Sequence, residues 1–350
     1  MIMLGAEPSD TAASPGIRAP LRPFDFENYL VEAAVDIDEA LTTFLLKAPD
    51  ICNLRDGALY GMGLDVDDRA MRGKRLRSIL CLMTCEALGG ARKDAMPFAV
   101  ASELLHNLAL VHDDIADQDE TRRWRSAVWV KYGVGHAVNI GDYLFSKALE
   151  STLELKSQGF AVETVLELVG LIIQTANRTI EGQSVDIAFH TRTDLTVDDY
   201  VEACIAKTGY YLAAPAVGGA MIAGGSPEVC AALREFGQYA GPAFQIVDDL
   251  LDLTRGKGRG EIGADIKEGK RSLLVILVGG LCTPTERVRL YEILDTPRAQ
   301  TSEQDVMWAV ELFLKYKVPD LALEQAQKFF AAADHAVAEL PEALRASLRA

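Results

Sequence analysis

From Phe24 to the C-terminus, apolar and polar positions follow the three- and four-residue spacing of amphipathic helices. Runs of Leu, Ala, Val and Ile recur at this spacing and are separated by glycine, proline or charged clusters. The strict alternation that indicates strands is nearly absent. We therefore predict helices at 26–47, 68–88, 95–117, 133–155, 162–190, 197–223, 227–253 and 272–280, with several more after Thr285.

Several of these predicted helices are apolar on more than one face, which is typical of helices inside a large bundle. Neither a composition shift nor a proline-rich linker divides the chain from residue 24 onward. We therefore expect one all-α domain over residues 24–350. Residues 1–23 are rich in Ala, Pro, Gly and Ser and resemble no secretion leader, so we expect a disordered N-terminal extension.

The charge balance and the cysteine pattern narrow the class of protein further. A formal net charge of -16 argues against a nucleic-acid partner, and any anionic ligand then needs a local basic pocket. The six cysteines are dispersed without a CxxC pair, which favours buried free thiols in a reducing compartment. No segment has the roughly 20 apolar residues of a membrane span. We expect a soluble, cytoplasmic protein.

Two acidic clusters follow nearly uncharged apolar runs: Asp113, Asp114 and Asp117 form the first, and Asp248, Asp249 and Asp252 form the second. On a helix, residues four apart share a face, so each cluster makes a compact patch of oxygen donors. Such patches repel themselves unless cations join them, and two of them suggest divalent metals held against a diphosphate. A single cluster could be a solvated helix end, but its repetition favours a shared cavity.

The stretch 104–117 with Arg122 and Arg123 resembles the first aspartate-rich motif of the trans-isoprenyl diphosphate synthases, the polyprenyl synthetase family, and 244–252 resembles the second. Further matches occur in the family's order at 73–77, 182–186, 207–208 and 265–270, so the resemblance runs from about Arg72 to Leu274. Within this family the chain resembles geranylgeranyl and farnesyl diphosphate synthases.

This resemblance implies a single large helical bundle of the isoprenoid synthase type with a central cavity. It also implies a prenyltransferase that ionises an allylic diphosphate and condenses it with isopentenyl diphosphate. The resemblance implies Mg²⁺ as the cofactor, with three ions once substrate is bound. Carboxylates suit this metal, because Mg²⁺ prefers carboxylate, phosphate and water oxygens. The family also implies a homodimer.

The resemblance assigns roles residue by residue. It gives direct metal ligation to Asp113, Asp117 and Asp248, and a supporting or water-mediated role to Asp114, Asp249 and Asp252. It gives isopentenyl diphosphate binding to Lys74, Arg77, His106 and Arg123. It assigns binding of the allylic diphosphate to Arg122, Lys207 and Lys270. Thr208 and Gln245 match polar groups near the developing carbocation, where an oxygen dipole favours positive charge.

Each of these residues has a structural explanation when it is considered alone. Lys74, Arg75 and Arg77 could form an exposed basic helix face. His106 could be a hydrogen-bonded core histidine. Arg122 and Arg123 could pair with Asp119 and Glu120 on the surface, where such pairs contribute only about 0–1 kcal/mol. Gln183 and Asp186 could join helices and remain candidates for a supporting role. Their joint occurrence in the family's order favours the functional interpretation.

The chain departs from the family pattern at several positions. Trp124 stands where the family has glycine, so the shape of the loop after Arg123 is expected to differ. Gly260 stands where the family has a lysine, and Lys257 or Arg259 is a possible substitute from the neighbouring loop. Ser78 replaces the usual proline, and a basic C-terminal tail is not present before Ala350.

Product length is expected to depend on the cavity floor beneath the first cluster. Leu108 and Ala109 lie about one turn before Asp113, on the side of the floor. The family often has an aromatic residue there in farnesyl synthases and small residues in enzymes with long products. Leu108 beside Ala109 therefore suggests geranylgeranyl diphosphate, although Ser102, Leu105 and the facing segment 143–149 could also form the floor.

Two rival hypotheses remain. A class I terpene cyclase shares the fold and ionises the same substrates, but it needs no isopentenyl diphosphate site. A regulatory subunit descended from a synthase would explain the missing lysine and the altered loop.

Overall fold

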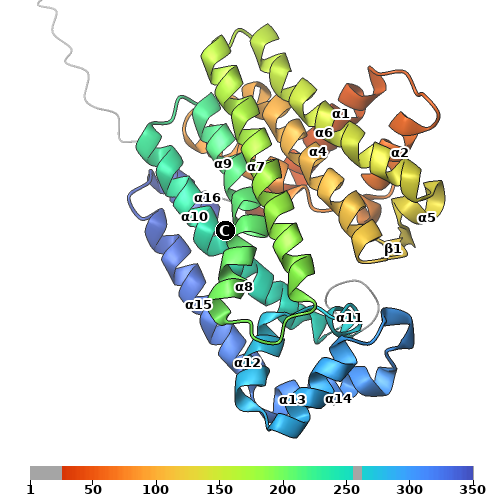
Figure 1. The fold of residues 1–350 in the computed structure, drawn as a ribbon. Coiled ribbons are helices and arrows are strands. Elements are labelled where there is room, and N and C mark those ends of the chain that lie inside the picture. Colours follow the sequence, from red (N-terminus) through yellow and green to blue (C-terminus); the bar gives the residue numbers. More distant parts are fainter. Residues whose placement is uncertain (1–25, 255–261, 350) are drawn as a thin grey trace, which may run out of the picture.

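The computed structural model describes residues 26–254 and 262–349, which form an all-α fold with one two-residue β-hairpin (Figure 1). The expected extension at 1–23 lies outside the described residues, so the division into an extension and one domain stays a prediction. The helices of the N-terminal half are α1 (Phe26–Leu46), α2 (Leu54–Gly61), η1 (Arg69–Met71), α3 (Leu76–Ala87), α4 (Arg92–Ala116), α5 (Val128–Tyr132), α6 (Val134–Ser157) and α7 (Val162–Phe189).

The C-terminal half continues with helices after α7, and the hairpin lies between α4 and α5. The hairpin pairs β1 (Thr121–Arg122) with β2 (Arg125–Ser126). The remaining helices are α8 (Val197–Cys204), η2 (Ile205–Gly209), α9 (Tyr210–Ile222), α10 (Pro227–Asp252), α11 (Ala264–Lys267), α12 (Leu273–Leu281), α13 (Pro284–Leu294), η4 (Arg298–Gln300), α14 (Glu303–Lys315), α15 (Val318–Ala336) and α16 (Glu342–Arg349).

The strongly periodic segments are confirmed as helices. The predicted helices at 26–47, 133–155, 162–190 and 227–253 are observed as α1, α6, α7 and α10 with nearly the same bounds. Local signals explain where α10 begins, because the Ser226 hydroxyl accepts a hydrogen bond from the Val229 amide and Pro227 occupies the first helical position.

The prediction of one helix over 68–88 is wrong. Only the 3₁₀ turn η1 and α3 are helical there, and Gly73 and Arg75 between them have φ values of 51° and 53°. An α-helix cannot pass through residues with positive φ, so the chain leaves the helical path before α3 begins.

The predicted helix over 197–223 is confirmed as helical along its length. The helical path is continuous, but η2 at its centre is a π-helical segment between α8 and α9. Segments with this wider hydrogen-bonding pattern are frequent at functional sites, and η2 contains Lys207 and Thr208.

The helices are organised around separate hydrophobic cores. Helix α4 packs along α6, α3 packs along α9, and α10 packs against α9 and α15 (Figure 1). The main core joins α1 to α7, with residues such as Ile37, Phe98, Leu104 and Ile140 fully buried. A second core joins the C-terminal end of α10 to α8 and to α12–α15, where Ile246 and Phe313 are buried.

The apolar character of the helices and the state of the cysteines can be described for residues 26–254 and 262–349. Within them, no helix is long and apolar enough to cross a bilayer. Five cysteines are buried and unpaired, as expected, but Cys52 is exposed because it lies in the turn before α2 with a φ of 54°.

Candidate functional site

Both acidic clusters occupy the last turn of a long helix. Asp113 and Asp114 lie at the end of α4, with Asp117 as its C-terminal cap, and the second cluster ends α10 at Asp252. The C-terminal end of a helix carries partial negative charge, so carboxylates there are unfavourable without cations or donors nearby. The surroundings of the two clusters therefore decide what they can bind.

The first cluster is compensated by cations. The Asp114 carboxylate is buried and accepts from Arg122 Nε at 2.7 Å and Nη2 at 2.5 Å. Burial raises the pKa of Asp114, and the Arg122 guanidinium opposes this shift. Burial also raises the pKa of Asp117, although Lys270 Nζ lies 3.8 Å from its Oδ2 and acts in the opposite direction. Asp113 is half-buried, and its negative charge further raises the pKa of Asp117.

Several neutral donors contact the second cluster from the described residues. The buried Asp249 carboxylate accepts from the Tyr200 hydroxyl at 2.8 Å, the Gln245 amide at 3.2 Å and the Leu273 backbone N–H at 3.2 Å. Asp252 is also buried and accepts from the Asp265 backbone N–H at 3.1 Å. Asp248 is half-buried in the same turn of α10.

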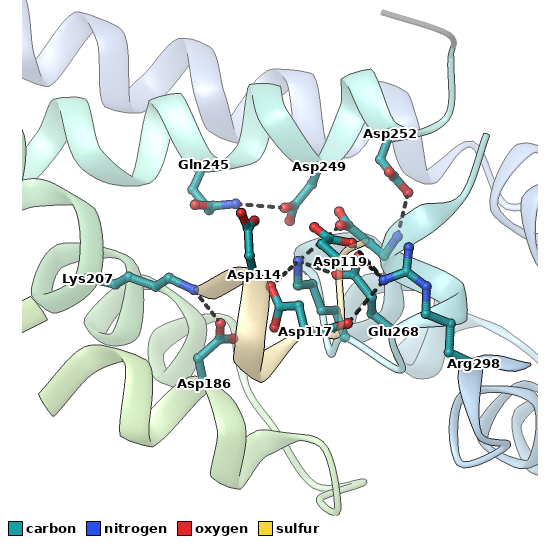
Figure 2. Close-up of polar contacts among 12 residues, drawn as sticks. Asp114, Asp117, Asp119, Asp186, Lys207, Gln245, Asp249, Asp252, Glu268 and Arg298 are labelled. Atoms are coloured by element: carbon teal, nitrogen blue, oxygen red, sulfur yellow. Dashed lines mark hydrogen bonds and ion pairs between the residues drawn. The ribbon is translucent and has the colours of Figure 1, made fainter. Parts of the chain in front are cut away.

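The two clusters face each other across one space. Figure 2 shows Asp114 and Asp117 opposite Gln245 and Asp249, whose helix runs along the other side. A chain of ion pairs closes the end of this space: Lys270 Nζ lies 2.5 Å from Glu268, and Glu268 lies 3.3 Å from Arg298. Arg298 also donates to the carbonyl of Asp117 at 3.1 Å. Residues far apart in sequence are thereby held around the acidic walls.

A basic pocket lies beside the first cluster. Arg77 Nη1 lies 3.2 Å from His106 Nε2, and the guanidinium stacks over the Tyr211 ring at 5.3 Å. Burial and the Arg77 charge hold the pKa of His106 well below its usual range, so this imidazole is neutral at physiological pH. Burial lowers the pKa of Arg123 to about 10. Lys74 is exposed at the edge of this region.

Two guanidinium groups of this pocket have buried donors without a partner among the described residues. These donors are Nε of Arg77 and Nη1 of Arg123. An unsatisfied buried donor on a cation costs about 1–3 kcal/mol or more, so this arrangement is suited to an anion that would accept from both.

Two of the purely structural explanations for the basic residues are wrong. Arg75 is fully buried and does not belong to an exposed basic face. Arg122 pairs with Asp114, not with Asp119 or Glu120, and Asp119 pairs with Arg298 at 2.7 Å.

On the opposite side, α7 and η2 present polar groups to the same space. Lys207 Nζ pairs with Asp186 at 2.9 Å (Figure 2). Burial would lower the pKa of Lys207, but the Asp186 and Asp113 carboxylates outweigh it and raise the value. Lys207, Thr208, Gln245, Asp249 and Lys270 line a common cavity of about 60 Å³. Of the two candidates for a supporting role, Asp186 thus holds Lys207, while Gln183 lines a neighbouring apolar cavity.

Glycines make this close approach of three helices possible. A Cβ atom on Gly182 of α7 would lie 2.5 Å from the backbone nitrogen of Lys207, and one on Gly241 of α10 would lie 2.6 Å from Cα of Gly209. Neither distance is compatible with a larger residue, so these two positions bring α7, η2 and α10 into direct backbone contact.

Beneath the first cluster lies an apolar cavity of about 360 Å³. Leu108 and Ala109 line it from α4, with Leu105 one turn further down and Phe145 facing them from α6. Ser102 does not line the cavity, because its buried hydroxyl donates to the carbonyl of Phe98. Asp113 also lines this cavity, so an apolar chain inside it would have its polar end at the acidic wall.

The donor set fits Mg²⁺ when substrate supplies further oxygens. Among the described residues, no three His, Cys, Asp or Glu side chains already form a metal-binding group. The raised pKa of Asp117 reflects a buried carboxylate that lacks sufficient positive charge. Mg²⁺ usually binds one or two carboxylates together with waters and substrate phosphates, which agrees with such a site.

The departures from the family pattern have different outcomes. Arg123 and Trp124 both have positive φ, 51° and 65°, so they form the two central residues of the hairpin turn, and the Trp124 side chain is exposed. Ser78 is buried, and its hydroxyl donates to the carbonyl of Ala99. Lys257, Arg259 and Gly260 lie outside the described residues.

Sequence reasoning missed several residues of this region. Arg298 and Glu268 close the end of the site, and Tyr211 supports Arg77. Arg298 belongs to no motif and lies 181 residues from Asp117, so no spacing could have identified it. Tyr211 had a weak signal, since it follows closely after Lys207 and Thr208.

Comparisons with known proteins agree with this geometry. A family model described as polyprenyl synthetase matches residues 67–313. A short chain isoprenyl diphosphate synthase of Methanothermobacter thermautotrophicus is 38% identical over 253 residues, which cover 71% of this chain and 75% of that protein. A geranylgeranyl diphosphate synthase of Sulfolobus acidocaldarius is 32% identical over 311 residues, covering 87% and 89%.

Solved structures give the same result. The fold is similar to that of geranylgeranyl pyrophosphate synthetase from Pyrococcus horikoshii, with a TM-score of 0.80, 32% identity, and coverage of 93% of this chain and 97% of that one.

Proposed function

Because the chain belongs to the polyprenyl synthetase family and is a trans-prenyltransferase, we propose that it makes geranylgeranyl diphosphate. The substrates would be an allylic diphosphate and isopentenyl diphosphate, and the cofactor would be Mg²⁺, with three ions once substrate is bound. The relatives named as geranylgeranyl diphosphate synthases support this product.

The observation that carries this proposal is the pairing of two unlike pockets. Opposed carboxylates on α4 and α10 form one, and the unsatisfied guanidinium donors of Arg77 and Arg123 form the other. A single diphosphate would need only one of these. Two such groups match two diphosphate substrates, and Asp113 of the acidic wall also lines the apolar cavity that would hold the growing chain. A terpene cyclase has no use for the second pocket.

Each group has a defined task in the proposed reaction. When bound, Mg²⁺ would neutralise the departing pyrophosphate and be held by Asp113, Asp117 and Asp248, which are the half-buried members of their clusters. Asp114, Asp249 and Asp252 would hold the neighbouring loops in place. Lys207, Lys270 and Arg122 would grip the allylic diphosphate, and Lys74, Arg77, His106 and Arg123 would grip isopentenyl diphosphate.

The chemistry then follows from charge placement. The allylic C–O bond breaks, pyrophosphate leaves, and the carbocation forms near Thr208 and Gln245. The double bond of isopentenyl diphosphate attacks this cation and forms the new C–C bond. Loss of a proton to the released pyrophosphate completes the step and leaves an allylic diphosphate longer by five carbons.

Incubation with Mg²⁺, isopentenyl diphosphate and each of the dimethylallyl, geranyl and farnesyl diphosphates tests the proposal by mass spectrometry. We expect geranylgeranyl diphosphate from all three. Hydrocarbon or alcohol products from farnesyl diphosphate alone would support a cyclase. Absence of turnover, with activation of a second synthase on mixing, would support a regulatory subunit.

Product length is tested separately by Leu108→Ala. Removing this side chain from the wall of the apolar cavity should lengthen the product. Phe145→Ala on the facing helix is the matched comparison. An unchanged product from Leu108→Ala would remove Leu108 from the control of chain length.

We propose a homodimer through α7. Leu166, Ile173, Ile180 and Ile187 recur every seven residues and are 61%, 40%, 61% and 53% exposed. Such a stripe on one helix face is the pattern by which helices pair with each other. Sedimentation equilibrium should give twice the mass of 38.0 kDa, and Ile173→Glu with Ile180→Glu should give monomers. A monomeric wild-type protein would contradict the dimer.

A further inference from the structure

Arg75 holds an unusual place between two residues of the basic pocket. It lies between Lys74 and Arg77 in the segment that enters α3, and its backbone has a φ of 53°. A non-glycine residue in this left-handed conformation is strained and persists only when its surroundings hold it there. Its side chain makes no cap hydrogen bond to α3.

The surroundings of the Arg75 side chain come from three separate elements. Nε donates to Asp38 of α1 at 2.8 Å, Nη1 donates to Glu103 of α4 at 3.1 Å, and Nη2 donates to the carbonyl of Met62, after α2, at 3.0 Å. The Arg75 side chain has no exposed area, and those of Asp38 and Glu103 are 9% and 2% exposed. The guanidinium is therefore fixed at every nitrogen.

Glu103 connects this cluster to the functional part of α4. It lies one turn before His106 and accepts from the Asn107 amide at 3.3 Å and from the Ser78 hydroxyl at 3.5 Å. Ser78 directly follows Arg77, whose guanidinium contacts His106. Arg75 and Glu103 thereby join the segment that carries Lys74 and Arg77 to the helix that carries His106.

We infer that Arg75, held by Asp38 and Glu103, is the positioning residue that sets Lys74, Arg77 and His106 at the spacing required for the isopentenyl diphosphate. This inference rests on the proposed function of that pocket. Each guanidinium nitrogen of Arg75 already donates to protein, and the side chain has no exposed area, so it would not contact the substrate. It fixes a left-handed turn that directs its own side chain inward and leaves Lys74 exposed.

The test is Arg75→Lys, which keeps the charge but cannot bridge three acceptors. We expect the KM for isopentenyl diphosphate to rise at least tenfold, while the KM for the allylic diphosphate stays within twofold. Glu103→Gln is the second variant and should shift the same KM in the same direction. It covers the outcome in which Arg75→Lys does not fold.

Arg72→Gln is the matched control. Arg72 also pairs with Asp38, at 3.3 Å, but its side chain is 20% exposed and it does not reach Glu103. Both KM values should stay within twofold of wild type. Calorimetric binding of isopentenyl diphosphate to each variant without an allylic substrate should show the same order of affinities.

The outcomes separate the inference from the proposed function. The inference alone is overturned if the wild type is active but Arg75→Lys and Glu103→Gln leave both KM values unchanged or raise them equally. A wild type that neither binds nor uses isopentenyl diphosphate overturns the proposed function and the inference with it.

Discussion

Asp114 and Asp249 occupy the same position in their clusters, yet the described residues contact them with donors of different kinds. Asp114 pairs with the guanidinium of Arg122, whereas Asp249 accepts from the hydroxyl of Tyr200 and the backbone of Leu273. The first cluster is thus balanced by side-chain cations that a diphosphate could recruit. The second is built into the junction of α8, α10 and α12. One sequence pattern is thus held by a guanidinium in the first wall and by hydroxyl and backbone donors in the second.

The largest effect should come from Asp113→Asn in the first cluster. Loss of this carboxylate should lower kcat about 10²–10³-fold, because it removes a ligand of the Mg²⁺ that would neutralise the leaving pyrophosphate. The free energy of unfolding should change by less than about 0.5 kcal/mol, since the residue is half-buried among like charges.

Single-turnover kinetics and urea unfolding measure the two quantities. Asp142→Asn is the control, because Asp142 lines the same apolar cavity but belongs to neither cluster. An Asp113→Asn variant with normal turnover would contradict a metal-binding role for the first wall.

Asp249→Ala, in contrast, should mainly lower the free energy of unfolding. It leaves the donors of Tyr200 and Leu273 buried without an acceptor, so we expect a loss of about 2–3 kcal/mol in the free energy of unfolding. Tyr200→Phe removes one of these bonds and should cost about 1 kcal/mol. If Asp249→Ala unfolds at the wild-type urea concentration, the second wall is not structural and the comparison fails.

When metal is removed with EDTA, the pH dependence of the free energy of unfolding should reveal the contribution of Asp117 in the first cluster. The pKa of Asp117 is raised in the folded state, so protonation favours folding. That stabilisation is complete below the unfolded value of about 4 and is lost as pH rises through the raised pKa. The slope can reach about 1.4 kcal/mol per pH unit for one carboxyl.

Urea unfolding of the wild type and of Asp117→Asn between pH 4 and 7 measures this contribution as a difference. The variant should lack that part of the decline, and Mg²⁺ with pyrophosphate should abolish it in the wild type. Parallel curves for the two proteins would show that Asp117 has an ordinary pKa.

The smallest effect concerns the hairpin that carries Arg122 to the first cluster. Trp124→Gly should raise the free energy of unfolding by about 1 kcal/mol, because glycine adopts the φ of 65° without strain. Trp124→Ala is the matched control, since it removes the indole but keeps the Cβ atom that causes the strain. Equal stability of the two variants would place the effect in the side chain and not in the backbone.

The sequence predicted those parts of the molecule in which local pattern and packing agree. Helices α6, α7 and α10 have long periodic stripes, and their predicted bounds are nearly correct. The spacing within each acidic cluster indicated a shared face on one helix. The resemblance then indicated that α4 and α10 face each other, and the structure places the two clusters opposite each other.

Other features depend on contacts between distant residues and left no local signal. The break before α3 occurs at Arg75, whose left-handed backbone is held by Asp38 and Glu103 from other helices. The π-helical η2 depends on glycines of α7 and α10 that allow backbone contact. Arg298 reaches the first cluster from beyond every recognised motif.

The placement of the two acidic walls in different hydrophobic cores has a thermodynamic consequence. Helix α4 is anchored in the main core, whereas the acidic end of α10 is anchored in the other core. A ligand that spans both walls therefore links elements of these two cores, in addition to the third core that α9 and α10 share. Its binding energy adds to the free energy of unfolding of the whole molecule, so saturation with ligand should raise the melting temperature.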